Sequence, residues 1–349
     1  MVGIVIQVID LFCGVGGLTC GLIESGLNVI AGFDVDPTCK YTYEKNNHVS
    51  YYQQNIRDVT GEQVNELFDK DVTKILVGCA PCQPFSQMRF KLGEENENDE
   101  KYDLLLEFGR LIEEIKPTII SMENVPKIRK TKVFEDFVRT LNVNGYYHTE
   151  NVVYCPEYGI PQTRRRFVLV ASLLGPIELI PPSHIPDEIH VKDFIKELPS
   201  ISAGDVCEKD PLHRSASLSE INLKRIRASK PGGTWNDWPE ELRCKCHLRP
   251  SGKTYSSVYG RMTWEQIGPT ITTQFYSYGT GRYGHPEQDR ALSLREGALL
   301  QTFPVNYDFI DPTHAFVFRD IARHIGNAVP PRLGEVIGES ILCHLKNMH

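Results

Sequence analysis

Long hydrophobic runs are missing from this sequence of 349 residues. No apolar stretch approaches the roughly 20 consecutive residues that a helix needs to cross a bilayer. Internal repeats and low-complexity tracts are missing as well. The sequence therefore predicts a soluble protein with no membrane partner, long enough for one large domain and a smaller one.

The ten cysteines lack the regular spacing of a disulfide framework. They are scattered over a long chain, and Cys13, Cys20, Cys79 and Cys343 lie in apolar contexts. No charged-then-apolar leader precedes the first predicted strand. We therefore expect a reduced, cytoplasmic protein.

An excess of positive charge is also missing, since the formal net charge is −7. Taken alone, this value argues against a polyanionic partner. The charge is unevenly distributed, however, because residues 212–262 carry ten Lys or Arg against four acids. A basic segment on an acidic chain can still bind phosphates, because the local field governs the contact. An ordinary solvated surface explains this segment equally well.

Apolar runs of strand length alternate with helical patterns from residue 4 to about residue 172. Strands are predicted at 4–12, 29–33, 74–78, 118–122 and 167–171, and helices at 18–25, 38–45, 104–115 and 133–141. This alternation is typical of an α/β fold with a doubly wound, mostly parallel sheet. Prolines then break the pattern, and helical periodicity returns at 294–302 and from 332 onward. We expect a first domain of residues 1–175 and 291–349, and a second, smaller domain of residues 176–290.

A glycine-rich turn follows the first predicted strand and opens the first predicted helix. Residues 10–17 are Asp-Leu-Phe-Cys-Gly-Val-Gly-Gly, and such glycines let the backbone approach a ligand in a tight turn. Asp34 ends the second predicted strand, where a carboxylate can accept hydrogen bonds from both hydroxyls of a ribose. The turn carries no Gly-Lys-Ser or Gly-Lys-Thr sequence, so an adenosine without a polyphosphate fits best. A purely structural turn is the alternative.

Cys82 lies just beyond the predicted strand 74–78, within Pro-Cys-Gln-Pro-Phe-Ser at residues 81–86. The carboxyl end of a parallel strand faces the crevice where open α/β sheets bind ligands. The flanking prolines stiffen the turn. A cysteine in this position is placed to act as a nucleophile, although most cysteines are simply small buried hydrophobes.

Three further clusters lie near strand ends or close to the end of the chain. They are Met-Glu-Asn-Val-Pro at 122–126, Gln-Thr-Arg-Arg-Arg at 162–166 and Gly-Asn-Ala-Val-Pro-Pro at 326–331. With the glycine turn and Pro81-Cys82-Gln83, they make the chain resemble the bacterial DNA (cytosine-5) methyltransferases of the restriction-modification type. The five motifs match in order and spacing over nearly the whole length. The resemblance implies the S-adenosylmethionine-dependent methyltransferase fold, S-adenosyl-L-methionine as cofactor and double-stranded DNA as partner.

The chemistry explains why these residue types belong together. Carbon 5 of cytosine is a poor nucleophile, and a thiolate of Cys82 adding to carbon 6 would make the ring an electron-rich enamine. Glu123 can absorb the resulting charge through ring nitrogen 3 if it holds a proton in a poorly solvated pocket. By resemblance, Arg166 reaches the cytosine O2, and Gln162 and Arg164 support the loop around it. A surface salt-bridge cluster is the alternative for these three residues. The sequence identifies no base for the carbon 5 proton. The expected catalytic residues are Cys82, Glu123, Arg164 and Arg166.

The resemblance also implies a set of cofactor contacts around the glycine turn. One departure is visible, because Asn55 stands where the family usually has an acid that touches the adenine amino group. Its side-chain oxygen can still accept that hydrogen bond, so weakened rather than lost binding is expected. The implied cofactor-binding residues are Asp10, Phe12, Gly14, Gly16, Gly17, Asp34, Val35, Asn55, Ile56, Pro81, Leu104, Asn327 and Val329.

A cytosine inside a duplex cannot present carbon 6 to a thiolate, so the nucleotide must be flipped out. Residues 86–101, rich in turn-forming and charged residues, suit a mobile lid. Residues 176–290 are expected to form a target-recognition domain. Within it, residues 270–274 and 278–282 are interpreted as a strand and a turn that present groups to bases and phosphates.

Cys244, Cys246 and His247 invite a zinc interpretation. Zinc needs a fourth ligand and usually two residues between paired cysteines. We therefore expect ordinary packing and no metal, and we expect Trp235 and Trp238 to lie in the core of the second domain.

Two other functions compete with DNA methylation. A transfer-RNA cytosine-5 methyltransferase shares most of these motifs, but its Cys-Phe-Thr signature does not occur here. A non-catalytic regulator typically loses the nucleophile or the acid, and both Cys82 and Glu123 are present. We expect a monomeric bacterial or phage enzyme that protects DNA against a partner endonuclease, and an orphan regulatory methylase is equally compatible.

Overall fold

The structure is a computed structural model that describes residues 5–81, 103–249 and 257–348. The chain divides into two compact units. The first comprises Met1–Tyr158, Arg165–Pro182 and Val329–His349, and the second comprises Gly159–Arg164 and Ser183–Ala328. Residues 291–328, which we expected in the first domain, therefore cluster with the second unit.

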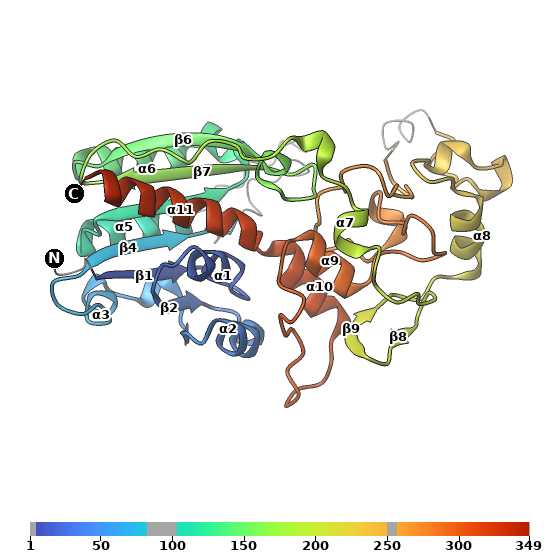
Figure 1. Ribbon diagram of the computed structural model, residues 1–349, viewed down its shortest axis with the longest axis horizontal. Helices are drawn as coiled ribbons and strands as arrows, with labels where there is room; N and C mark the ends of the chain where they lie inside the picture. The colour runs from blue at the N-terminus through green and yellow to red at the C-terminus, as the bar shows by residue number, and fades with distance from the viewer. Residues whose placement is uncertain (1–4, 82–102, 250–256, 349) are drawn as a thin grey trace. The chain divides into compact units, whose positions relative to one another are not determined.

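A mostly parallel sheet forms the centre of the first unit (Figure 1). Its seven described strands have the order β3-β2-β1-β4-β5-β7-β6. They span β1 Ile6–Leu11, β2 Val29–Asp34, β3 Ser50–Gln53, β4 Thr73–Gly78, β5 Ile119–Asn124, β6 Tyr147–Tyr154 and β7 Arg165–Ser172. Pairing is parallel from β3 to β5, and β7 is antiparallel to both β5 and β6. The order reverses beside β1, as in doubly wound folds.

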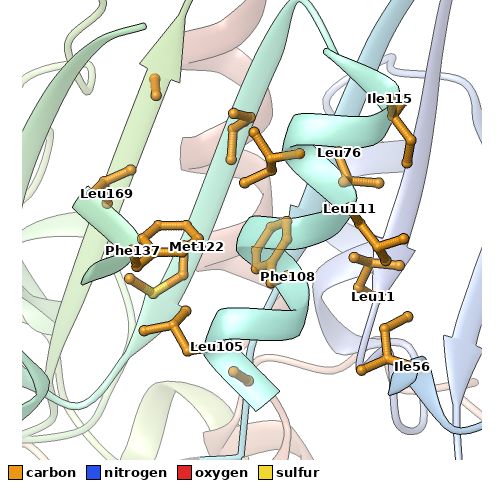
Figure 2. Packing of buried hydrophobic residues seen from close by; sticks show 14 of the residues in the cluster. Leu11, Ile56, Leu76, Leu105, Phe108, Leu111, Ile115, Met122, Phe137 and Leu169 are labelled. Carbon is orange, nitrogen blue, oxygen red and sulfur yellow. The ribbon is translucent and has the colours of Figure 1, made fainter. Parts of the chain in front are cut away.

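Helices cover the sheet of the first unit. They are α1 Gly17–Glu24, α2 Lys40–Asn47, α3 Gly61–Asn65, α5 Leu104–Ile115, α6 Lys132–Val143 and α11 Pro331–Asn347. The apolar residues of α5 recur at helical spacing, and Figure 2 shows Leu105, Phe108 and Leu111 pointing toward the sheet. These side chains pack against Leu76 of β4 and Met122 of β5. Successive residues of a strand point to opposite faces of the sheet, so the residues next to Leu76 and Met122 along each strand face away from α5.

Two glycines bring α1 and α11 into close contact. A Cβ atom added at Gly21 would lie 2.6 Å from the backbone nitrogen of Glu335, and one added at Gly334 would lie 2.7 Å from the carbonyl oxygen of Leu18. Only glycine permits this approach, because real Cβ contacts are not that short. The last helix is thereby fixed on the first, which begins at the glycine turn.

The second unit contains short elements joined by turns. They are α7 Lys192–Ile195, β8 Val206–Cys207, β9 Asp210–Arg214, α8 Glu220–Ala228, α9 Leu294–Leu300 and α10 Phe318–Asn327. Buried charges hold α9 in this unit, since Arg290 Nη2 lies 2.6 Å from Glu296 Oε1 and both side chains are fully buried. Arg295 also pairs with Asp210 of β9 at 2.6 Å. These contacts explain why residues 291–328 do not cluster with the sheet.

Trp235 and Trp238 lie in the core of the second unit, as predicted, with exposed fractions of 4% and 1%. They pack with Ile226, Tyr278 and Ala291. The expected strand at residues 270–274 is wrong, because residues 270–272 are irregular and residues 273 and 274 lie in a turn. Residues 278–280 form a short 3-10 helix. The main chain at Ile271 bonds the side chain of Gln162 instead of a neighbouring strand. Among the described residues, no helix combines the length and the apolar character needed to cross a membrane.

Candidate active site

The glycine turn follows β1 and forms a tight backbone loop. Phe12, Gly14 and Gly16 have φ angles of 61°, 51° and 85°, a region that favours glycine, so Phe12 stores strain at the start of the loop. A Cβ placed on Gly14 would meet nothing within 4 Å. The turn therefore has open space beside it at Gly14.

Asp34 at the end of β2 closes this turn from the side. Its Oδ2 accepts a hydrogen bond from the backbone N–H of Gly14 at 2.8 Å, and its Oδ1 accepts one from Asp36 at 2.9 Å. Burial raises the pKa of the Asp34 carboxyl, and these two backbone donors act in the opposite direction. Each carboxylate oxygen has a second lone pair that could accept a ribose hydroxyl.

Asp10 lies beneath the turn and is 1% exposed. Its Oδ2 accepts a hydrogen bond from Thr19 Oγ1 at 2.7 Å, and its Oδ1 is buried without a hydrogen bond among the described residues. Burial raises the pKa of this carboxyl to about 7. Asp10 thus ties the turn to α1 from inside the fold.

The remaining implied cofactor residues occupy varied positions. Gly17 begins α1, Val35 is 63% exposed just after β2, and Ile56 is buried in the core. Leu104 begins α5, Pro81 is described just before the gap that starts at residue 82, and Val329 is buried in the first unit. Asn55 uses its side-chain oxygen to accept a hydrogen bond from the Arg57 N–H at 3.2 Å. Asn327 ends α10 and belongs to the second unit.

Glu123 on β5 is a buried acid at the carboxyl end of its strand, with an exposed fraction of 3%. Arg166 on the neighbouring strand β7 places its Nε 2.9 Å from Glu123 Oε1 as an ion pair. That oxygen has no hydrogen bond among the described residues. The structure thus brings together Glu123 and Arg166, two of the residues expected to act on the base.

Cys79 also contacts Glu123, and the sequence did not predict this contact. Its Sγ lies 2.8 Å from Glu123 Oε2. The next residue is tied to the same strand, because Asn124 Nδ2 donates to the carbonyl oxygen of Ala80 at 2.9 Å. The contact follows from the strand register, since Gly78 pairs with Met122 in the parallel ladder and the following residues are neighbours.

The other expected catalytic residues are Cys82 and Arg164. Cys82 lies outside the described residues, as do residues 86–101. Arg164 is buried in the second unit, where its guanidinium donates to the carbonyl oxygens of Ile271 at 3.0 Å and Ala328 at 3.4 Å. Gln162 is fully buried and donates to the carbonyl oxygen of Leu300 at 2.7 Å. Both hold segments of the second unit together, in keeping with support for a loop.

Cys244, Cys246 and His247 lie close together in the second unit. One ligand atom from each lies within 4.8 Å of the others. The His247 ring stacks on Trp235 with a centroid distance of 4.2 Å. No fourth His, Cys, Asp or Glu joins this group in the part of the chain that the structure describes. The expectation that it binds no metal stays a prediction.

Some of the basic side chains in the segment 212–262 make contacts within the protein. Arg261 is buried and donates to several backbone carbonyl oxygens, and Arg225 lies over the rings of Trp238 and Tyr259. The basic side chains described as exposed are Lys224, Arg227, Lys230, Lys245 and Arg249.

Comparisons with known proteins agree along the whole chain. The family model described as C-5 cytosine-specific DNA methylase matches residues 6–343. The chain is 52% identical to the Type II methylase M.HgiDII of Herpetosiphon aurantiacus, covering 98% of this chain and 96% of that protein. It is 30% identical to the Type II methyltransferase M.Eco47II of Escherichia coli, covering 97% and 79%. Among solved structures, the Entamoeba histolytica methyltransferase EhMeth superposes with a TM-score of 0.70 at 18% identity, covering 97% and 98%.

Proposed function

Because the chain belongs to the C-5 cytosine-specific DNA methylase family, we propose that it methylates carbon 5 of a cytosine flipped out of a specific duplex sequence, through a covalent Cys82 adduct. DNA cytosine-5 methylation of the Type II restriction-modification kind is the activity of the family. We also propose that S-adenosyl-L-methionine is the methyl donor.

One observation carries the assignment of the acid. Glu123 is almost fully buried, yet its Oε1 has no hydrogen bond among the described residues. Arg166 Nε faces this oxygen at 2.9 Å as an ion pair, so its charge has a partner while its capacity for a hydrogen bond is unfilled, and such a buried group calls for an explanation such as a catalytic role. Ring nitrogen 3 of a cytosine in this position would supply the missing hydrogen bond if Glu123 holds a proton.

The residues around the glycine turn fit S-adenosyl-L-methionine. The open space at Gly14 admits the ligand, and the carboxylate of Asp34 has capacity for ribose hydroxyls. The exposed apolar surface of Val35 suits an adenine face, and Asn55 Oδ1 keeps one lone pair for its amino group. When bound, the cofactor supplies an electrophilic methyl group.

The chain's own residues prepare the base for that methyl group. The thiolate of Cys82 forms a bond to carbon 6, and the electron pair of the 5,6 double bond moves into the ring. Glu123 gives its proton to ring nitrogen 3, which leaves an enamine whose carbon 5 is nucleophilic. After methylation, the carbon 5 proton leaves to a base that we do not assign and its electron pair restores the 5,6 double bond as the thiolate of Cys82 departs. Ring nitrogen 3 then returns its proton to Glu123.

Arg166 has two roles in this proposal. Its guanidinium neutralises the Glu123 carboxylate once the proton has been transferred, and it carries further N–H groups that can donate to the cytosine O2. Its side chain is 14% exposed, so some of its surface remains available to substrate. Arg164 acts at a distance by fixing the backbone at Ile271 and Ala328.

Residues 176–290 are proposed to recognise the target sequence. The exposed side chains of Lys224, Lys230 and Lys245 are suited to phosphates, which position a protein on DNA without reading sequence. Base-edge contacts are proposed for polar groups of residues 270–282.

The wider context follows from the relatives. Type II methylation is paired with an endonuclease, so we propose a cognate endonuclease that cuts the same unmethylated site. All five motifs lie on one chain, which supports action as a monomer. Bacterial DNA lies in the cytoplasm, where we propose the enzyme works. The transfer-RNA alternative is less supported, because the family model and the curated relatives are DNA methylases.

The test is transfer of labelled methyl groups from S-adenosylmethionine to unmethylated duplex DNA and, in parallel, to transfer RNA. We expect label as 5-methylcytosine in DNA, and none with Cys82→Ser. Sequencing of the labelled positions gives the target site. Label only in RNA would establish the rival activity, and DNA labelling that survives Cys82→Ser would contradict the covalent mechanism.

A further inference from the structure

Cys79 and Glu123 are neighbours because of the pairing of β4 with β5. The two strands are parallel, and Gly78 at the end of β4 is registered with Met122. Gly78 and Met122 face α5, where a Cβ on Gly78 would approach the ring of Phe108 at 3.2 Å. The next residue on each strand points to the opposite face. The thiol and the carboxyl group therefore meet on the face away from α5.

The Glu123 carboxyl is held differently at its two oxygens. Oε2 lies 2.8 Å from Cys79 Sγ, while Oε1 faces the charge of Arg166 but has no hydrogen bond among the described residues. Asn124 holds the carbonyl oxygen of Ala80, so the backbone that follows Cys79 is fixed to the same strand. The backbone that carries the Cys79 sulfur is therefore tied to β5, the strand that carries Glu123.

We propose that Cys79 is a positioning residue for the methyl-transfer reaction. Its S–H donates to Oε2 of Glu123, which fixes the rotation of the carboxyl group and presents Oε1 to ring nitrogen 3 of the cytosine. This inference rests on the proposed role of Glu123. A cysteine that only fills space would not fix the orientation of the Glu123 carboxyl group.

Two substitutions separate a hydrogen bond from packing. Cys79→Ser replaces the S–H donor with an O–H donor, whereas Cys79→Ala keeps the small volume and removes the donor. We expect Cys79→Ala to lower kcat about 10-fold, the order of one hydrogen bond to a charged group, with KM for DNA within about twofold. We expect Cys79→Ser to recover most of the lost rate. A packing role predicts the reverse order, because a buried hydroxyl is less well tolerated than a methyl group.

The pH profile of kcat gives a second readout that packing would not move. A donor to the carboxylate favours its ionised form, and the reaction requires the protonated form. Removing the donor therefore extends activity to higher pH, and we expect the alkaline limb of the kcat profile to lie at higher pH in Cys79→Ala than in the wild type. Cys79→Ser should follow the wild type. Cys343→Ala, an exposed cysteine on α11 of the first unit, is the control and should change neither kcat nor the profile.

Glu123→Gln, measured in parallel, distinguishes failure of this inference from failure of the proposed function. If Glu123→Gln keeps wild-type activity, the role of Glu123 is wrong and the basis of the inference is lost. If Glu123→Gln is strongly impaired while Cys79→Ala keeps wild-type kcat and pH profile, the proposal for Cys79 alone is overturned. Equal thermal midpoints of the Cys79 variants would exclude misfolding as the cause of a lowered rate, and a lowered midpoint in Cys79→Ala without a pH shift would also overturn the proposal.

Discussion

At the scale of single residues, the fold leaves two carboxyl groups in costly environments. One carboxyl oxygen of Glu123 and one of Asp10 make no hydrogen bond among the described residues. Burying such groups costs free energy that the rest of the fold must offset. The two differ in their surroundings, because Glu123 lies beside Arg166 at the carboxyl end of β5, whereas Asp10 lies inside the fold beneath the glycine turn. Only Glu123 is therefore suited to meet a substrate.

Glu123→Gln tests the acid directly. The amide keeps the shape of the side chain and can donate a hydrogen bond, but it cannot transfer a proton. We expect kcat to fall about 10² to 10⁴-fold, the usual range for general acid catalysis, with DNA binding largely retained. Glu150→Gln is the matched control, because Glu150 pairs with Arg129 on the surface. A loss of DNA affinity with unchanged kcat would contradict the assignment.

Asp10 predicts a pH dependence of stability. Burial raises its pKa in the folded protein to about 7, above the ordinary value of 3.8. The folded state thus holds the proton more tightly, so the stability contributed by protonated Asp10 is present below about pH 4 and is lost as the pH rises toward 7. Asp10→Asn has no proton to lose. The difference in unfolding free energy between Asp10→Asn and wild type should shift in favour of the variant by on the order of 3 kcal/mol over this range.

Urea unfolding of both proteins at several pH values between 5 and 8 measures that difference. A difference that does not vary with pH would mean that Asp10 is already ionised in the folded protein throughout this range.

At the scale of elements, the sequence predicted the strands and helices that position the site. The apolar runs at residues 74–78 and 118–122 became β4 and β5, and the helix at 104–115 was predicted with its observed ends. It did not predict β6. This strand lies at the edge of the sheet and is largely solvent-accessible, so its sequence lacks the regular alternation of apolar and polar residues that indicates a strand. It also missed α10, which begins at Phe318 and has no side-chain cap at the preceding residue, Val317.

Cys79 was missed for a related reason. Contacts between strands depend on register, and register follows from the pairing of whole strands rather than from any local motif. The glycine turn and Asp34, in contrast, were recognisable because each lies at a strand end that the apolar pattern already predicted.

The contact between α1 and α11 gives a prediction at this scale. Gly21→Ala places a methyl group against the backbone of α11, and we expect a loss of about 1 to 3 kcal/mol of unfolding free energy. Gly109→Ala on α5 is the matched control, because its Cβ would meet nothing closer than 3.6 Å. That variant should be neutral or slightly stabilising, since alanine favours a helix. Thermal unfolding of both variants checks the comparison, and equal effects would rule out the close approach at Gly21.

At the scale of the whole molecule, an acidic chain must bind a polyanion. The net charge is −7, and the basic excess of residues 212–262 lies in the second unit. The sequence could count these charges but could not tell which of them fold inward, as Arg261 does. The exposed lysines that remain are the candidates for phosphate contacts.

The salt dependence of DNA binding tests them. Each phosphate contact contributes about −0.9 to the slope of log K against log salt concentration. Replacing Lys224, Lys230 or Lys245 with Gln should weaken binding on all sequences and reduce the magnitude of this slope by about 1 for each lost contact. Lys70→Gln, on the exposed surface of the first unit, is the matched control. Unchanged slopes for all three variants would remove this surface from the DNA interface.

The covalent step at Cys82 is tested most directly by intact-mass measurement of the protein with S-adenosylmethionine and duplex DNA in which the target cytosine carries fluorine at carbon 5. Fluorine cannot leave as a proton does, so the reaction should stop after methylation with the base still bound to the enzyme. We predict a protein–DNA adduct of one strand per chain with the wild type, mapped to Cys82, and none with Cys82→Ser. Methylation of ordinary duplex DNA by this enzyme, with no adduct on the fluorinated duplex, would contradict the account.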